Sequence, residues 1–194
     1  MSIVQDRSSI VGALSPETTT VKLWPYAPGF YGRDALYRVW LAMEEAGDTQ
    51  RAFWDRAMWP EIGGDLASFI KAFDGVPTTV LLLVEGPPAQ QLIGCLWLSE
   101  LIKDHQAFLS IWMSKSGRPY AREASKQAID YAFTGWNLAQ LWAITPWAGA
   151  ANLARRMGFE RVAVLPDYCR FPETNYDVTV LRLTKARWGN GVDF

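Results

Sequence analysis

The spacing of apolar and polar residues changes several times along residues 108–159, and each change marks a different element. Residues 108–113 form an apolar run of strand length, residues 120–133 repeat apolar side chains at helical spacing, and residues 141–145 form a second strand-like run. A strand, a short loop, a helix and a second strand make a βαβ unit, in which the helix begins beside the carboxyl end of the first strand. We therefore expect a site for an anionic ligand where residues 114–119 join strand to helix.

Two further helices are predicted before this unit. The first follows Asp34 and ends near Gly47, and the second has Asp65 as its N-cap and ends at residues 74–75. Apolar residues recur at helical spacing in both. These positions are Leu36, Val39, Trp40 and Met43 in the first helix, and Leu66, Phe69, Ile70 and Phe73 in the second.

The remaining strands are predicted from alternation and turn residues. Residues 18–24 alternate polar and apolar side chains over a β-branched run, and residues 78–85 and 91–99 form a hairpin across a Gly-Pro-Pro turn. A short helix ends at residues 157–159, and two more strands follow it. Their apolar positions are Val162 and Val164, then Val178, Val180, Leu181 and Leu183, with residues 166–175 interpreted as a long irregular connection.

The order β-α-α-β-β-β-α-β-α-β-β predicts the α/β class: a mixed sheet with helices on its faces. At 194 residues the chain has the length of one ordinary domain. We place that domain at residues 18–188, after a weakly ordered lead-in at residues 1–17 and before a tail at residues 189–194.

Composition excludes several classes of protein. A hydrophobic content of 49% with 20% charged residues is typical of a globular domain. The net charge of −1 and the absence of a long basic run argue against a nucleic-acid partner. The longest apolar run, at residues 80–84, is too short to span a membrane, and the first residues lack the pattern of a secretory signal. We expect a soluble, cytoplasmic protein.

Ten tryptophans are an unusual number for this length. They fit an aromatic core, a surface for self-association such as a homodimer, or a surface that stacks on a ligand or acyl group. The aromatic residues between positions 53 and 60 either line a cleft or pack beneath a long connection, and Trp97, Trp112 and Trp147 either shape a pocket or fill the core.

The cysteines and the single histidine limit the chemistry that is available. Cys95 and Cys169 lie in apolar, strand-like contexts, which favours buried and inert thiols. His105 is flanked by polar residues of an exposed loop, although its side chain is also a candidate base. One histidine and two distant cysteines make a zinc site improbable, so no metal is expected.

Two segments carry a resemblance to a known family. The helix-opening loop places Ser114, Gly117 and Pro119 where the family pattern Gln/Arg-x-x-Gly-x-Gly/Ala has its defining residues. The segment ending at Gly158-Phe159 parallels a second pattern, Asn-x-x-Ala-x-x-Leu-Tyr-x-Lys-x-Gly-Phe. It matches at Ala150, Leu153 and Arg156, has Trp147 for the asparagine, and has Ala154 for the tyrosine. Over residues 18–188 the chain resembles the GNAT superfamily of acyl-CoA-dependent N-acyltransferases.

This resemblance implies a fold and a donor site. The implied sheet is mostly antiparallel, with six or seven strands and a splayed central pair. Acetyl-CoA, or another acyl-CoA, is the implied co-substrate, and its pyrophosphate binds backbone N–H groups at the helix N-terminus. The resemblance places the acyl-CoA site at Ile111, Trp112, Met113, Ser116, Gly117, Arg118, Tyr120, Ala121 and Arg122.

The implied reaction is direct transfer of the acyl group to a primary amine on a small molecule or peptide. Glu100, at the end of a strand, is the candidate catalytic base. The hydroxyls of Ser110, Tyr120, Tyr168 and Tyr176 are candidates to replace the missing tyrosine acid, and Arg155 and Arg156 either reach CoA phosphates or are solvated surface charges. The alternative is a GNAT-fold protein that has lost activity and serves in binding or structure.

Overall fold

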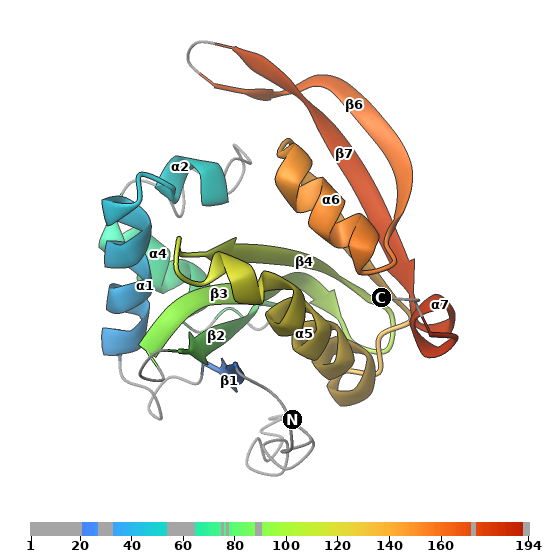
Figure 1. The fold of residues 1–194 in the computed structure, drawn as a ribbon, viewed down its shortest axis with the longest axis horizontal. Coiled ribbons are helices and arrows are strands. Elements are labelled where there is room, and N and C mark those ends of the chain that lie inside the picture. Colours follow the sequence, from blue (N-terminus) through green and yellow to red (C-terminus); the bar gives the residue numbers. More distant parts are fainter. Residues whose placement is uncertain are drawn as a thin grey trace.

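The structure is a computed structural model that describes residues 21–26, 33–53, 65–74, 76, 78–87, 91–171 and 174–191. These residues contain a seven-stranded sheet in the order β1-β2-β3-β4-β5-β7-β6 (Figure 1). Its strands are β1 (Lys22–Pro25), β2 (Val80–Gly86), β3 (Gln91–Ile102), β4 (Gln106–Met113), β5 (Gln140–Thr145), β6 (Glu160–Arg170) and β7 (Asn175–Thr184). The predicted α/β class and the hairpin of β2 and β3 are confirmed.

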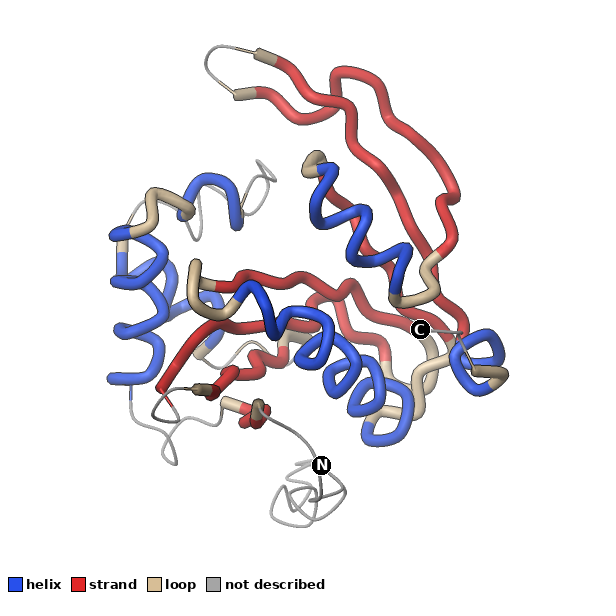
Figure 2. The backbone as a smooth tube through the Cα atoms, viewed as in Figure 1, coloured by secondary structure: helices blue, strands red, loops and turns tan. Residues whose placement is uncertain are grey.

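Helices lie on both faces of this sheet, as predicted (Figures 1 and 2). They are α1 (Arg33–Glu45), α2 (Thr49–Ala52), α4 (Leu66–Phe73), a 3₁₀ turn η2 (Arg118–Tyr120), α5 (Ala121–Gly135), α6 (Ala148–Arg156) and α7 (Lys185–Gly189). Helices α1 and α4 pack with the side chains of β2, β3 and β4 that point to one face, while α5 covers the other face.

The apolar periodicity accounts for the position of α1 and α4. Leu36, Val39 and Met43 are fully buried, so the predicted stripe of α1 is the face that packs on the sheet. Asp65 caps α4, because its carboxylate accepts a hydrogen bond from the backbone N–H of Ser68 at 2.7 Å. Both predicted helices are confirmed.

At least one of the ten tryptophans, Trp97, belongs to an aromatic core. Trp97 is 2% exposed, and its ring lies 5.3 Å from that of Phe53 and 6.1 Å from that of Phe73, in the tilted and edge-on arrangements that aromatic rings prefer. Phe53 is therefore part of the core and is not among the residues that line the cleft described below. The other aromatic residues of this segment, Trp54 and Trp59, lie outside the described residues.

One pairing in the sheet is parallel and short. Strands β4 and β5 pair only through residues 106–108 and 140–142, although both strands continue for several residues. All other neighbouring strands are antiparallel. Beyond Phe108 the two strands diverge, which confirms the expected splayed central pair.

The structure corrects the prediction in the last third of the chain. Residues 166–170 belong to β6, and β7 begins at Asn175, so most of the predicted irregular connection is strand. The register shifts twice along β6, between Arg161 and Ala163 and between Leu165 and Cys169. Such bulges break the alternation of side chains on which the sequence prediction depended. The short helices α2 and α7 were not predicted either.

Candidate active site

A cleft occupies the gap between β4 and β5. It has a cavity volume of about 90 Å³ and is bounded by both strands, by α5 and by α6. The wall is mainly apolar, with a few hydroxyls. Its residues are Arg51, Ala52, Leu109, Ser110, Ile111, Ser125, Ile129, Ala143, Ile144, Thr145, Trp147, Ala150, Leu153, Ala154, Met157 and Phe159.

The edge of β4 presents backbone polar groups to this cleft. The N–H of Ser114 donates to the carbonyl of Ile93 on β3 at 3.0 Å, so this edge position points toward β3. Backbone groups alternate between the two edges of an antiparallel strand. The N–H groups of Ile111 and Met113 consequently point toward the gap, where β5 has diverged and does not pair with them. A strand edge of this kind binds an extended ligand by main-chain hydrogen bonds.

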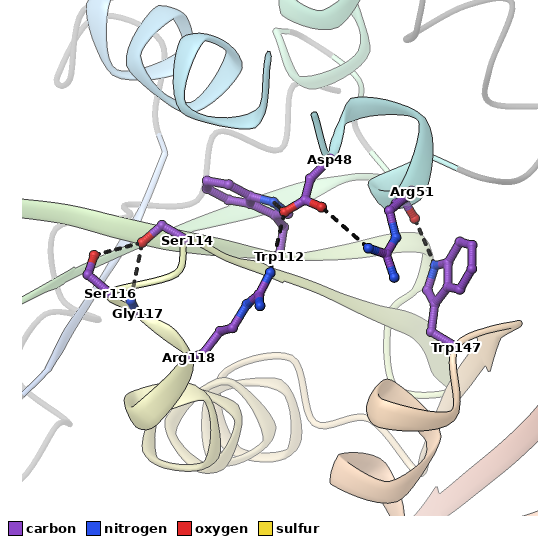
Figure 3. A network of polar contacts seen from close by, with 8 residues as sticks. All are labelled: Asp48, Arg51, Trp112, Ser114, Ser116, Gly117, Arg118 and Trp147. Carbon is purple, nitrogen blue, oxygen red and sulfur yellow. Dashed lines mark hydrogen bonds and ion pairs between the residues drawn. The ribbon is translucent and has the colours of Figure 1, made fainter. Parts of the chain in front are cut away.

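The loop between β4 and α5 is held by its own hydrogen bonds. The N–H groups of Gly117 and Arg118 both donate to the carbonyl of Ser114 at 3.0 Å, and the N–H of Tyr120 donates to the carbonyl of Gly117 at 2.9 Å. The hydroxyls of Ser114 and Ser116 lie 3.0 Å apart, and that of Ser114 also accepts from Gly117 at 3.2 Å (Figure 3). The loop is therefore a preformed turn that leads into the N-terminus of α5.

Gly117 is required by close packing. A Cβ atom on this residue would lie 2.2 Å from the carbonyl oxygen of Ile93, far inside normal contact. Its φ of −81° is accessible to any residue, so conformational freedom is not the reason for glycine here. The glycine lets the loop approach the backbone of β3 directly.

Asp48 joins three elements next to the cleft residue Arg51, although it is not itself among the residues that line the cleft (Figure 3). Its carboxylate accepts a hydrogen bond from the Trp112 indole N–H of β4 at 3.3 Å. It also lies 3.8 Å from the guanidinium of Arg118, in the turn before α5, and 4.0 Å from that of Arg51 in α2. Its side chain is 13% exposed. The carboxylate is thus almost enclosed, beside the strand and the turn that frame the cleft.

Trp147, the N-cap of α6, connects the two sides of the cleft. Its indole N–H donates to the carbonyl of Arg51 at 3.0 Å, and the Arg51 guanidinium lies 4.8 Å from its ring centroid (Figure 3). The same ring packs against Phe171 and Tyr176 at centroid distances of 5.5 Å. Trp147 is therefore a cleft residue that links α2 to α6 and to the β6–β7 hairpin.

The residues predicted to bind acyl-CoA lie around one end of β4, although their side chains face different ways. Ile111 lines the cleft, whereas Trp112 and Met113 are buried in clusters on opposite faces of the sheet. Ser116, Arg118 and Arg122 are exposed, Gly117 is buried, and Tyr120 and Ala121 are half-buried at the start of α5.

The predicted base lies elsewhere. Glu100 is in an irregular part of β3, next to Ser99, which pairs with Phe108 at the closed end of the gap. It is exposed, has a positive φ of 48°, and is not among the cleft residues. His105 is exposed in the following turn. The structure therefore brings neither group to the cleft, because the strand positions them at the opposite end of β4.

The hydroxyls proposed to replace the absent tyrosine lie in different places. Ala154, at the position of that tyrosine, lines the cleft together with Ala150. Of the hydroxyls proposed as substitutes, Ser110 lines the cleft, while Tyr168 and Tyr176 are 58% and 37% exposed on the β6–β7 hairpin. Arg155 and Arg156 are exposed on α6.

Sequence reasoning missed Asp48, Arg51 and Thr145. For Asp48 and Arg51 the only local signal was the dipeptide Asp48-Thr49 after Gly47, since aspartate and threonine are typical of a helix N-terminus. The hydroxyl of Thr145 lines the cleft and accepts the backbone N–H of Trp147 at 3.1 Å, so it orients the start of α6. Proximity of Asp48 to β4 is a property of the tertiary fold.

Both cysteines are buried, as predicted. Burial raises the pKa of the Cys95 thiol well above its ordinary value, so this thiol stays protonated. Within the described parts of the chain, no group of three or more histidine, cysteine, aspartate or glutamate side chains is placed to hold a metal ion. The same residues include no helix that is long and apolar enough to cross a membrane.

The strand order, the splayed pair β4 and β5, and the helices on both faces define the GNAT fold of acyl-CoA-dependent N-acetyltransferases. Among solved structures, spermidine N-acetyltransferase from Vibrio cholerae in complex with CoA and spermine is similar at a TM-score of 0.71. It is 18% identical, and the match covers 88% of this chain and 99% of that chain. A dodecameric form of the Vibrio cholerae enzyme matches at a TM-score of 0.67 and 19% identity, covering 88% of this chain and 97% of that chain.

At these identities the similarity establishes the fold. No known protein-family profile matches the chain. No curated protein matches it either.

Proposed function

We propose that the chain is an N-acyltransferase that moves an acetyl or related acyl group from acyl-CoA to a primary amine. The observation that carries this proposal is the cleft where β4 and β5 diverge, with backbone groups of β4 that β5 does not pair with on one wall and the turn into α5 at one end. The structural neighbour that binds CoA and spermine supports an acyl-CoA donor and a small amine acceptor.

Each part of acyl-CoA has a matching group. The pantetheine arm lies along the edge of β4, where main-chain N–H and C=O groups satisfy its amides. The thioester lies in the apolar cleft, and the N–H of Ile111 or Met113 polarises its carbonyl. The phosphates lie at the turn before α5, close to Arg118 and Arg122, where the helix dipole and guanidinium groups favour negative charge.

The reaction follows from this placement. The neutral amine attacks the thioester carbon, a C–N bond forms, the C–S bond breaks, and the proton lost by the nitrogen balances the proton taken up by the departing CoA thiolate. Ser110 is the hydroxyl we assign to the thiolate, because it lines the cleft on β4, the strand proposed to hold the thioester, whereas Ser125 is buried on α5 and the Thr145 hydroxyl accepts the Trp147 N–H. Neither cysteine can form an acyl-enzyme intermediate here, because both are buried outside the cleft.

A turnover assay tests the proposal. Acetyl-CoA is incubated with a panel of primary amines that includes polyamines, aromatic amines and peptide amines, and the released CoA thiol is measured. Amine-dependent thiol release that falls in Ser110→Ala supports the proposal. Acetyl-CoA binding without release of thiol with any amine would favour the inactive GNAT-fold alternative.

A cytoplasmic location and a homodimer belong to the same proposal. The dodecameric form of the Vibrio cholerae enzyme supports self-association in this fold. Light scattering measures the mass of the assembly directly, and a monomer at micromolar concentration would contradict the homodimer.

A further inference from the structure

We propose that Asp48 binds the ammonium group of a cationic acceptor, and that acyl-CoA exposes this carboxylate by drawing Arg118 away from it. The inference rests on the proposed function and adds a residue that selects the acceptor, together with a coupling between the two substrates. It is argued from the contacts of Asp48, Arg51, Arg118 and Trp147.

The carboxylate is fixed, whereas its charged partners are not. Asp48 is 13% exposed and is tied to β4 by the Trp112 indole N–H. The side chains of Arg51 and Arg118 are 59% and 64% exposed, and their distances of 4.0 and 3.8 Å are those of loose ion pairs. Long pairs whose guanidinium groups lie largely in solvent contribute little, so the arginines can leave at low cost while Trp112 holds the carboxylate in place.

Arg118 has a second possible partner. It occupies the first position of the turn that leads into α5, where the phosphates of CoA are proposed to lie. A phosphate carries more charge than a carboxylate and offers a guanidinium more acceptor oxygens. Acyl-CoA therefore competes with Asp48 for Arg118, and when the donor binds, the Asp48 carboxylate loses Arg118 as an ion-pair partner.

Arg51 marks the place that an acceptor cation would fill. Its guanidinium lies within reach of both the Asp48 carboxylate and the face of the Trp147 ring, at 4.0 and 4.8 Å, and Arg51 and Trp147 line the cleft (Figure 3). A carboxylate and an aromatic face together stabilise a bound cation. An ammonium at the same position makes both contacts, next to the strand that presents the thioester.

The coupling predicts that donor and acceptor strengthen each other's binding, by the same factor in each direction. Without an acceptor bound, Asp48 weakens acyl-CoA binding, because its ion pair with Arg118 must break before Arg118 can contact the phosphates. Removing the charge of Asp48 is therefore expected to raise the affinity for CoA by up to about fivefold, the upper range for a loose ion pair whose guanidinium lies in solvent. The effect is expected to vanish when Arg118 is already replaced.

Calorimetric titration of CoA into four proteins tests the exchange. These are the wild type, Asp48→Asn, Arg118→Gln and the double variant, with Glu45→Gln as a control for the change in net charge, since Glu45 is an exposed residue of α1. Asparagine keeps an oxygen that accepts the Trp112 N–H. Tighter binding in Asp48→Asn alone, absent in the Arg118→Gln background and in Glu45→Gln, is the expected result.

A second titration tests the acceptor site with spermine, agmatine and tyramine as probes, each with and without saturating CoA. CoA is expected to raise the affinity for at least one amine in the wild type, and Asp48→Asn is expected to abolish that increase. Equal or weaker CoA binding by Asp48→Asn overturns the inference, and so does amine binding that is absent, independent of CoA or unchanged in Asp48→Asn. Failure of the wild type to bind CoA at all removes the proposed function as well.

Discussion

Gly117→Ala is expected to destabilise the protein and to displace the loop that precedes α5. The added Cβ would lie 2.2 Å from the Ile93 carbonyl oxygen, 3.1 Å from the carbonyl carbon and 3.0 Å from Met113 Cε. Relief requires a movement of the loop or of β3 by about an ångström, and overpacking of this kind typically costs about 1–3 kcal/mol. For a chain of this length, a loss of about 2 kcal/mol lowers the melting temperature by about 4–8 °C.

Gly149→Ala provides the matched control. Gly149 lies in α6, and a Cβ atom there meets no atom within 4 Å, so alanine adds helix propensity without a clash and is expected to stabilise slightly. Both variants are compared with the wild type by urea and thermal unfolding, followed by titration with acetyl-CoA. The reasoning is refuted if Gly117→Ala is as stable as Gly149→Ala, because the close approach of loop and strand would then carry no cost.

Three further predictions concern individual side chains. Asp65→Ala is expected to lower stability at neutral pH. The hydrogen bond from the Ser68 backbone N–H lowers the pKa of Asp65 in the folded protein. The wild type is therefore more stable than the variant above the ordinary carboxyl pKa of 3.8, and this difference is lost as the pH falls through the lower pKa of the folded state. Unfolding at a series of acidic pH values measures the difference, and a difference that persists in strong acid contradicts the prediction. Glu100→Gln is expected to leave turnover unchanged, since Glu100 lies at the closed end of the gap, and a large fall in kcat would restore it as a catalytic group. Cys95 and Cys169 are expected to react with a thiol reagent only after unfolding, and rapid labelling of native protein would show that they are accessible.

The sequence predicted the parts of the fold that local periodicity governs. The stripe of α1 and the cap of α4 depend on residues within one or two turns of each other, so they were visible from the order of the residues. The length of β6 was not, because its bulges interrupt the alternation, and a four-residue helix such as α2 is too short for a periodic signal.

The candidate site was predicted less completely than the fold. Motif comparison located the end of β4 and the turn into α5, including the position of Gly117, although the reason for that glycine is contact with Ile93. Glu100 was proposed as the base because it lies at the end of a predicted strand. The sequence does not reveal whether that strand end lies at the open or the closed end of the gap between β4 and β5. Asp48 meets Arg118 and Trp112 across more than sixty positions of sequence, and only the fold brings such residues together.

The central claim is that acyl-CoA binds in the cleft between β4 and β5. Calorimetric titration of acetyl-CoA into the wild type, Ala150→Phe and Ala148→Phe tests it most directly. Ala150 lines the cleft, whereas Ala148 is exposed in the same helix. The account predicts saturable binding by the wild type and Ala148→Phe, and none by a folded Ala150→Phe. Equal binding by all three proteins, or no binding by the wild type, would contradict it.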